Sequence, residues 1–110
     1  MKEIKAYIRS NRVEAVVQAL QENNAPGITV IEVHPVGYGF DANYFSQARE
    51  TAKRYFKITK LELVADDADI PAFLEIVQKH AHTGASGDGI IFVTPVEMAV
   101  KIRTGQMNML

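Results

Sequence analysis

Thr83-Gly84-Ala85-Ser86-Gly87-Asp88-Gly89 is followed directly by Ile90-Ile91-Phe92-Val93, so a glycine-rich turn leads into a run of strand-forming residues. Three glycines within six residues allow the backbone N–H groups of the turn to converge on one anion. A tight turn requires the same composition without any ligand, and from spacing alone that simpler interpretation is favoured. The pattern therefore predicts a sharp turn and then a strand over Ile90–Thr94.

The segment before this turn predicts an amphipathic helix. Its apolar residues recur at the i, i+3, i+4, i+7 spacing of a helix that buries one face: Ile70, Phe73, Leu74 and Val77. Pro71 is tolerated in the first turn of a helix, because an N–H at that position has no partner. Asp66 and Asp67 suit the start of this helix, where carboxylates face the positive end of the helix dipole.

The N-terminal half predicts a strand, a helix and a second strand. Apolar residues alternate with polar ones over residues 4–9, as in a strand with one buried face. Ser10 or Asn11 offers an N-cap, and apolar residues then repeat at helical spacing over residues 13–20. β-branched residues dominate Ile28–Val33, which favours a second strand.

Two further strands are predicted downstream. Phe56–Ala65 alternates, with leucines on one face and Lys60 and Glu62 on the other. Val100–Arg103 alternates again, which predicts a short final strand. The elements therefore run β-α-β, long loop, β-α-β, with this short strand at the end.

This order, with its two crossover helices, predicts an α+β ferredoxin-like βαββαβ sandwich with both helices on one face of the sheet. A chain of 110 residues has room for a single domain, residues 1–110. The long segment that Gly37 opens is unusual in so small a domain, and a short helix is predicted over 45–54. On the other sheet face, Ile31 and Val33 predict burial against further copies of the chain.

The composition excludes several classes of protein. The chain has no cysteine, which excludes a disulfide scaffold, a thiolate nucleophile and a cysteine-based zinc site. A net charge of −1 gives no basic footprint of a nucleic-acid-binding protein. No stretch approaches the roughly 18 apolar residues of a membrane span, and no signal-peptide pattern is present. We expect a cytoplasmic protein with no nucleic-acid partner.

Lys101 and Arg103 are cations that could act together with the glycine turn. Two residues apart on a strand, their side chains would share one face at a spacing of roughly 6–7 Å. That spacing suits two oxygens of a phosphate or diphosphate group, which Arg can bind bidentately. The alternative is a solvated strand edge with two ordinary cations.

The histidines and carboxylates predict neither a metal site nor a catalytic centre. His80 and His82 would point about 200° apart on a helix, so a cationic pair at the helix C-terminus is favoured over a metal site. Asp66, Asp67 and Asp69 are explained by the helix start that they occupy. No nucleophile–base arrangement is visible, so the sequence predicts a protein that is not an enzyme.

Four segments together resemble the P-II family of nitrogen-signalling proteins: Gly27–Val33, Lys60–Val64, Thr83–Val93 and Ile102–Gly105. The resemblance covers nearly the whole chain, and the T-G-x-x-G-D-G-x-I-F-V block with a downstream I-R-T-G is quite specific. It implies a homotrimer with three clefts between subunits that bind adenine nucleotides. It also implies a long loop, about residues 37–55, that contacts a regulated target protein, an enzyme or a membrane transporter.

The resemblance further implies which residues form the nucleotide site. The family holds the phosphates with the turn Gly87, Asp88 and Gly89 and with the cations Lys101 and Arg103. The adenosine side is lined by Thr29, Gly37 and Val64.

The sequence departs from the family pattern at phosphate-binding positions. The family usually has a lysine directly after the Gly-Asp-Gly turn, where this chain has Ile90. Arginine and glutamine commonly follow the glycine at the loop base, where this chain has Tyr38 and Gly39, and Lys101 replaces an arginine. Each charge-assisted hydrogen bond lost to a phosphate costs about 1.5–3 kcal/mol. AMP or ADP is therefore expected to be favoured over ATP.

Two regulatory positions also depart from the family. Ile58 stands beside Lys57 in place of a lysine that helps hold 2-oxoglutarate, and Thr51 stands in place of the modifiable tyrosine. Neither 2-oxoglutarate sensing nor uridylylation is therefore expected, and no cofactor is required. One alternative keeps the fold but binds another small anion, such as bicarbonate, or a metal through the histidines. An enzyme on the same scaffold is the least favoured hypothesis.

Overall fold

The computed structural model describes residues 1–36 and 58–110. Within these residues the elements follow in this order: β1 (Lys2–Arg9), η1 (Ser10–Arg12), α1 (Val13–Glu22), β2 (Ile28–Val33), β3 (Ile58–Ala65), η2 (Asp67–Asp69), α3 (Ile70–Ala81) and β4 (Ile90–Pro95). None of the helices in these two ranges is both long and apolar enough to span a bilayer. The predicted loop over 37–55 and the helix over 45–54 lie outside the described residues.

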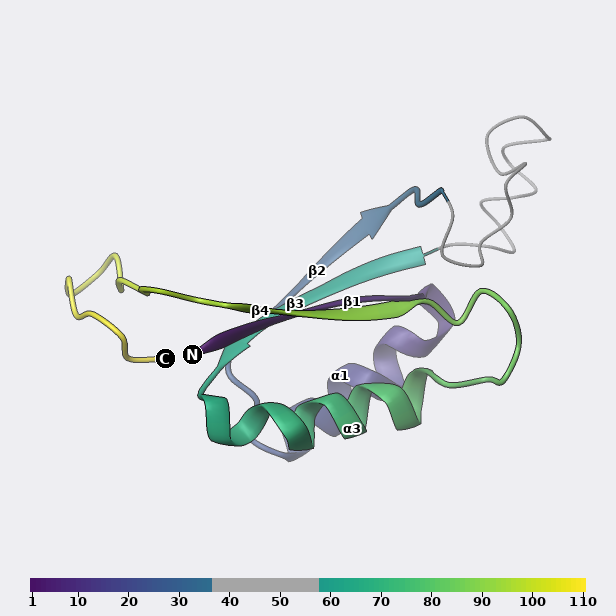
Figure 1. Ribbon diagram of the computed structural model, residues 1–110, viewed down its shortest axis with the longest axis horizontal. Helices are drawn as coiled ribbons and strands as arrows, with labels where there is room; N and C mark the ends of the chain where they lie inside the picture. Colours follow the sequence, from purple (N-terminus) through teal and green to yellow (C-terminus); the bar gives the residue numbers. More distant parts are fainter. Residues whose placement is uncertain (37–57) are drawn as a thin grey trace.

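The sheet has the strand order β2-β3-β1-β4, and all its neighbouring pairs are antiparallel. The crossover from β1 through α1 to β2 skips over β3, and the crossover from β3 through α3 to β4 skips over β1. Figure 1 shows α1 and α3 together on one side of the sheet. This is the split βαβ arrangement of a ferredoxin-like fold, so the predicted fold class is confirmed.

The core lies between the two helices and one face of the sheet. It is built from apolar residues of the central strands and of the helix stripes: Ile4, Ala6, Ile8, Val16, Leu20, Leu61, Leu63, Ala65, Phe73 and Val77. Alternation on the strands and the helical spacing on α1 and α3 direct these side chains toward each other. The periodicity in the sequence therefore located the core correctly.

The opposite face of the sheet carries charged residues. Lys60 Nζ lies 3.0 Å from Glu62 Oε1 on β3, and Lys5 Nζ lies 3.4 Å from Glu3 Oε1 on β1. Ile31 pairs in register with Lys60 and is 38% exposed, so an apolar side chain lies among these ion pairs. The burial of this face against further copies stays a prediction.

The helix starts differ from the predicted ones. A short 3-10 turn precedes each helix, and α1 and α3 begin at Val13 and Ile70 without a side-chain cap. The hydroxyl of Ser10, a predicted cap, lies 2.6 Å from the hydroxyl of Thr59 on β3. Asp67 pairs with the N-terminal amine at 2.9 Å. Ser10 and Asp67, which the local pattern assigned to helix starts, therefore bind partners elsewhere in the fold.

The predicted strand over Val100–Arg103 is wrong. The ladder between β1 and β4 reaches the start of β1 at the pair Lys2–Pro95, so β1 has no further length to offer residues 100–103. The C-terminal segment instead folds on itself, with an isolated bridge between Val100 and Met107 and a turn over residues 102–104. We call residues 100–107 the C-terminal hairpin.

Candidate functional site

The glycine turn folds around the carboxylate of Asp88. The N–H groups of Thr83 and Gly84 donate to its Oδ2 at 2.8 and 2.9 Å. The Thr83 hydroxyl and, at 3.2 Å, Arg9 Nε donate to its Oδ1. The Thr83 hydroxyl and N–H, followed by the Gly84 N–H and Arg9, hold the pKa of the Asp88 carboxyl well below its ordinary value. Asp88 is therefore ionised at neutral pH.

The anion at the start of this turn is thus a side chain of the turn itself. Spacing alone favoured a tight turn without a ligand, and the family resemblance implied that this turn holds a phosphate, whereas the amides of Thr83 and Gly84 are taken by Asp88. A phosphate would have to use other groups of the turn. The role of Gly87, Asp88 and Gly89 in phosphate binding stays a prediction.

Arg9 is a residue that the sequence analysis did not single out. Besides its bond to Asp88, its Nη2 donates to the carbonyl of Ser86 at 2.8 Å, so the last residue of β1 holds two points of the turn. The partners lie 79 and 77 residues away in sequence. Local periodicity only placed Arg9 on the outer face of a strand and could not have found this contact.

Gly89 is required where the turn meets β1. Its φ is +103°, and a Cβ built on it would lie 1.8 Å from the carbonyl oxygen of Tyr7. Gly87 also has a positive φ, of +96°. The close approach of two backbones therefore explains the glycine at position 89 without any ligand.

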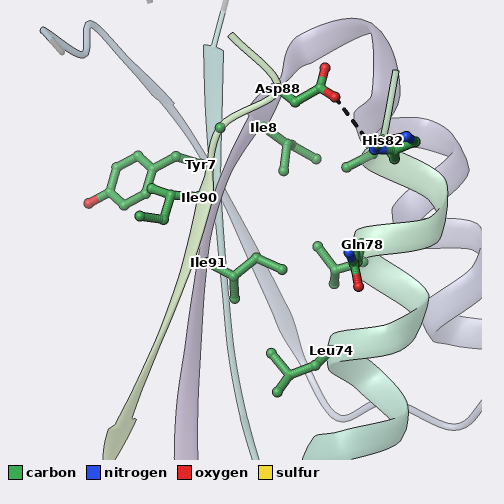
Figure 2. Close-up of a pocket in the computed structure, with 11 residues that line it drawn as sticks. Tyr7, Ile8, Leu74, Gln78, His82, Asp88, Ile90 and Ile91 are labelled. Carbon is green, nitrogen blue, oxygen red and sulfur yellow. Dashed lines mark ion pairs between the residues drawn. The ribbon is translucent and has the colours of Figure 1, made fainter. Parts of the chain in front are cut away.

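A cavity of about 440 Å³ lies beside the turn, between α3 and the edge strand β4. Figure 2 shows Ile8 and Ile91 on the sheet side facing Leu74 and Gln78 of α3. Its walls are thus mainly apolar. Its volume lies within the range of small-molecule sites.

The polar end of this cavity is formed by His82 and Asp88. Because α3 ends at Ala81, His82 lies beyond the helix, with its Nδ1 3.8 Å from Asp88 Oδ2 (Figure 2). His80 lies in the last turn of α3. Across residues 1–36 and 58–110, no group of three or more metal-ligating side chains could hold a metal ion. The alternative of a histidine-bound metal therefore has no third ligand in this part of the chain.

A second hollow, of about 250 Å³, lies at the other end of the sheet. It is lined by Thr29 of β2, Glu62 and Val64 of β3 and Leu110, among others. Two residues predicted to line the adenosine side, Thr29 and Val64, therefore share one hollow. Glu62 was not predicted as a site residue, but it pairs with Thr29 in the β2–β3 register, so strand pairing could have indicated it.

The predicted site residues fall into two groups at opposite ends of the sheet (Figure 1). Gly87 to Gly89 precede β4, whereas Lys101 and Arg103 follow it in the C-terminal hairpin, and six strand residues span about 20 Å. The same-face spacing predicted for these two cations does not hold, because they lie at a turn rather than on a strand. Gly37 lies outside the described residues. One chain does not bring the glycine turn to the group at the far end.

Comparison with known proteins identifies the family. The model of the nitrogen regulatory protein P-II family matches residues 1–106. The chain belongs to the P-II family. A P-II protein of Azospirillum brasilense is 39% identical over 106 residues, which cover 96% of this chain and 95% of the relative. P-II protein 2 of Methanothermobacter thermautotrophicus is 38% identical over 106 residues, covering 96% and 92% of the two chains.

Membership in the P-II family settles the functional class. P-II proteins are signal transducers in nitrogen regulation rather than enzymes, and as a family they bind adenine nucleotides. The predicted family and the predicted class of signalling regulator are therefore confirmed.

Proposed function

We propose that this P-II protein senses an adenine nucleotide, AMP or ADP in preference to ATP, at clefts between three copies of the chain. Nucleotide binding would shift the population of conformations of residues 37–55, through which the protein controls a target protein. Such coupling requires that the nucleotide bind one of these conformations better than another.

The observation that carries this proposal is the separation of the two groups of site residues. The glycine turn lies before β4, and the hollow at Thr29 and Val64 lies at the far end of the sheet. Because one chain keeps these groups apart, a site that uses both must lie between two copies, as the trimer of the family implies. Lys101 and Arg103 would then reach the turn of a neighbouring subunit.

The preference for fewer phosphates follows from the charges near the turn. Arg9 is already engaged by Asp88 and Ser86, so its guanidinium is shared before any phosphate arrives. Ile90, the first residue after the glycine turn, has no positive charge and points to the same side of the sheet as Tyr7 (Figure 2). Among the residues that the structure describes, we propose Lys101 and Arg103 of another copy as the source of further positive charge at the turn. Two cations suit one or two phosphates better than three.

The proposal is tested by measuring the mass of the purified protein by light scattering and its melting temperature with AMP, ADP and ATP. We expect a trimer stabilised more by AMP or ADP than by Mg-ATP, with no additional effect of 2-oxoglutarate. Arg103→Ala should abolish the nucleotide-induced shift, whereas Lys79→Ala, which removes a cation at the end of α3, should keep it. Tight Mg-ATP binding enhanced by 2-oxoglutarate would refute the nucleotide preference. A shift unchanged by Arg103→Ala would refute the phosphate assignment.

A further inference from the structure

Residues 108–110, which we call the tail, return toward the sheet after the C-terminal hairpin. The N–H of Asn108 donates to the carbonyl of Ala99 at 2.7 Å, and the side-chain oxygen of Asn108 accepts from the N–H of Ala99 at 3.2 Å. Asn108 also has a φ of +59°, a left-handed conformation that asparagine adopts more readily than most residues. The chain therefore changes direction at Asn108 and is fixed there to the segment that follows β4.

This change of direction brings Leu110 to the hollow at the far end of the sheet. Leu110 lines the hollow together with Glu3, Thr29 and Val64, which lie on three different strands. Figure 1 accordingly shows the two ends of the chain side by side, at the end of the sheet remote from the glycine turn. Leu110 is 45% exposed, so more than half of its surface is covered. The tail therefore supplies one wall of a hollow whose other walls belong to the sheet and to the turn before β2.

The walls of the hollow suit the uncharged part of a ligand. Leu110, Pro26 and Val64 contribute apolar surface, and a Cβ added to Gly27 would meet nothing within 4 Å, so the hollow is open at that point. Glu3 and Glu62 also line it, and carboxylates repel a phosphate. A nucleotide would therefore place its nucleoside part in the hollow and its phosphates elsewhere.

The size of the hollow agrees with this division. Its volume of about 250 Å³ lies below the roughly 300–1,000 Å³ of sites that enclose a whole small molecule. A single chain thus accommodates one part of a nucleotide here. The flat faces of a base are largely apolar and gain by contact with apolar side chains such as that of Leu110.

We infer that Leu110 is a nucleotide-binding residue, whose side chain packs against the nucleoside part of the ligand in the hollow at Thr29 and Val64. Asn108 is a positioning residue, which holds the tail over the hollow and touches no nucleotide. The inference rests on the proposed function, because it adds to the adenosine side of that site a residue that the sequence analysis did not single out.

Titration calorimetry of the full chain with AMP and with ADP tests this contact. Leu110→Ala should raise the Kd for both nucleotides by the same factor, about five- to tenfold, because the lost contact is apolar and does not involve the phosphates. Leu110→Met, which keeps a large apolar side chain, should stay within about twofold of the original chain. The matched control is Met109→Ala, which removes a 55% exposed side chain from the same tail that does not line the hollow. It should leave both Kd values unchanged.

Two variants of Asn108 test how Leu110 is positioned. Asn108→Ala removes the acceptor for the Ala99 N–H and disfavours the left-handed conformation, so it should weaken nucleotide binding by about as much as Leu110→Ala. Asn108→Asp keeps an acceptor oxygen and tolerates this conformation, so it should bind like the original chain. Equal weakening by Asn108→Ala and Asn108→Asp would overturn the positioning role.

The outcomes separate this inference from the proposed function. If the original chain binds AMP or ADP and Leu110→Ala binds equally well or more tightly, the inference alone is overturned, and tighter binding would mean that Leu110 obstructs the hollow. If Met109→Ala weakens binding as much as Leu110→Ala, the contact is not specific to Leu110 and the inference is again overturned. If the original chain binds no adenine nucleotide, the proposed function fails and the inference fails with it.

Discussion

Replacing Gly89 by alanine tests whether the glycine turn is shaped by its contact with β1. Gly89 has a φ of +103°, and an added Cβ would lie 1.8 Å from the carbonyl oxygen of Tyr7. This carbonyl belongs to β1, one of the two central strands of the sheet, so it cannot move without disturbing the hydrogen bonds to its neighbours. The substitution therefore forces the turn away from β1.

Two contributions determine the size of the effect. Alanine in a positive-φ conformation costs about 1–2 kcal/mol. Relieving the contact with the Tyr7 carbonyl requires a backbone shift of the kind that overpacking causes, which costs about 1–3 kcal/mol. We therefore expect Gly89→Ala to lower the free energy of unfolding by about 2–5 kcal/mol. That is a large share of the roughly 5–15 kcal/mol by which native proteins are stable.

The chain offers matched controls for each contribution. Gly105 has a φ of +73° with nothing within 4 Å of an added Cβ, so Gly105→Ala should show only the conformational cost. Gly27 has neither a positive φ nor a close neighbour, so Gly27→Ala should be neutral or slightly stabilising. Urea unfolding at one fixed protein concentration measures all three variants. If Gly89→Ala destabilises no more than Gly105→Ala, the close approach does not constrain the turn.

The remaining predictions concern the turn carboxylate and the core. Because the pKa of Asp88 is lowered from an ordinary value of 3.8, its contribution to stability is present above about pH 4 and is lost as the pH falls toward the folded pKa. Asp88→Asn should therefore be less stable than the original chain at neutral pH, with a difference that shrinks below about pH 4. Urea unfolding midpoints of both chains, measured from neutral pH to below about pH 4, test this prediction. A stability difference that stays constant over these pH values would contradict a lowered pKa of Asp88 in the folded chain. Leu20 is 0% exposed, so Leu20→Ala should lower the free energy of unfolding by about 2–5 kcal/mol, whereas Leu20→Met should lower it by less than about 1.5 kcal/mol. The same urea unfolding assay measures both variants. Equal losses would argue against a packed core at this position.

The fold was largely predictable from the sequence because its signals are periodic. The bounds of β2 were predicted correctly, since a run of β-branched residues between turn residues leaves little freedom. The same reasoning failed at residues 100–103, where alternation is present but no strand remains to pair with it. Alternation reports a preference for extended backbone, whereas a strand also needs a partner.

The candidate site was less predictable because its contacts are long-range. The glycine turn was recognised from Thr83 to Gly89, but the occupant of its first amides, Asp88, was not. The role of Arg9 could not be predicted from local patterns, because its partners lie almost eighty residues away in the sequence. The separation of Thr29 from the turn followed only once the order of the strands was known.

The bonds from Arg9 to Asp88 and Ser86 mean that the glycine turn is not a portable motif. Its shape is fixed jointly by seven consecutive residues and by the far end of a strand from the start of the chain. If the heptapeptide alone were grafted onto another scaffold, the carboxylate of Asp88 would lose its guanidinium donor. Gly89 would also lose the backbone of β1 against which it packs. A designer who wants this turn must carry over the first strand as well.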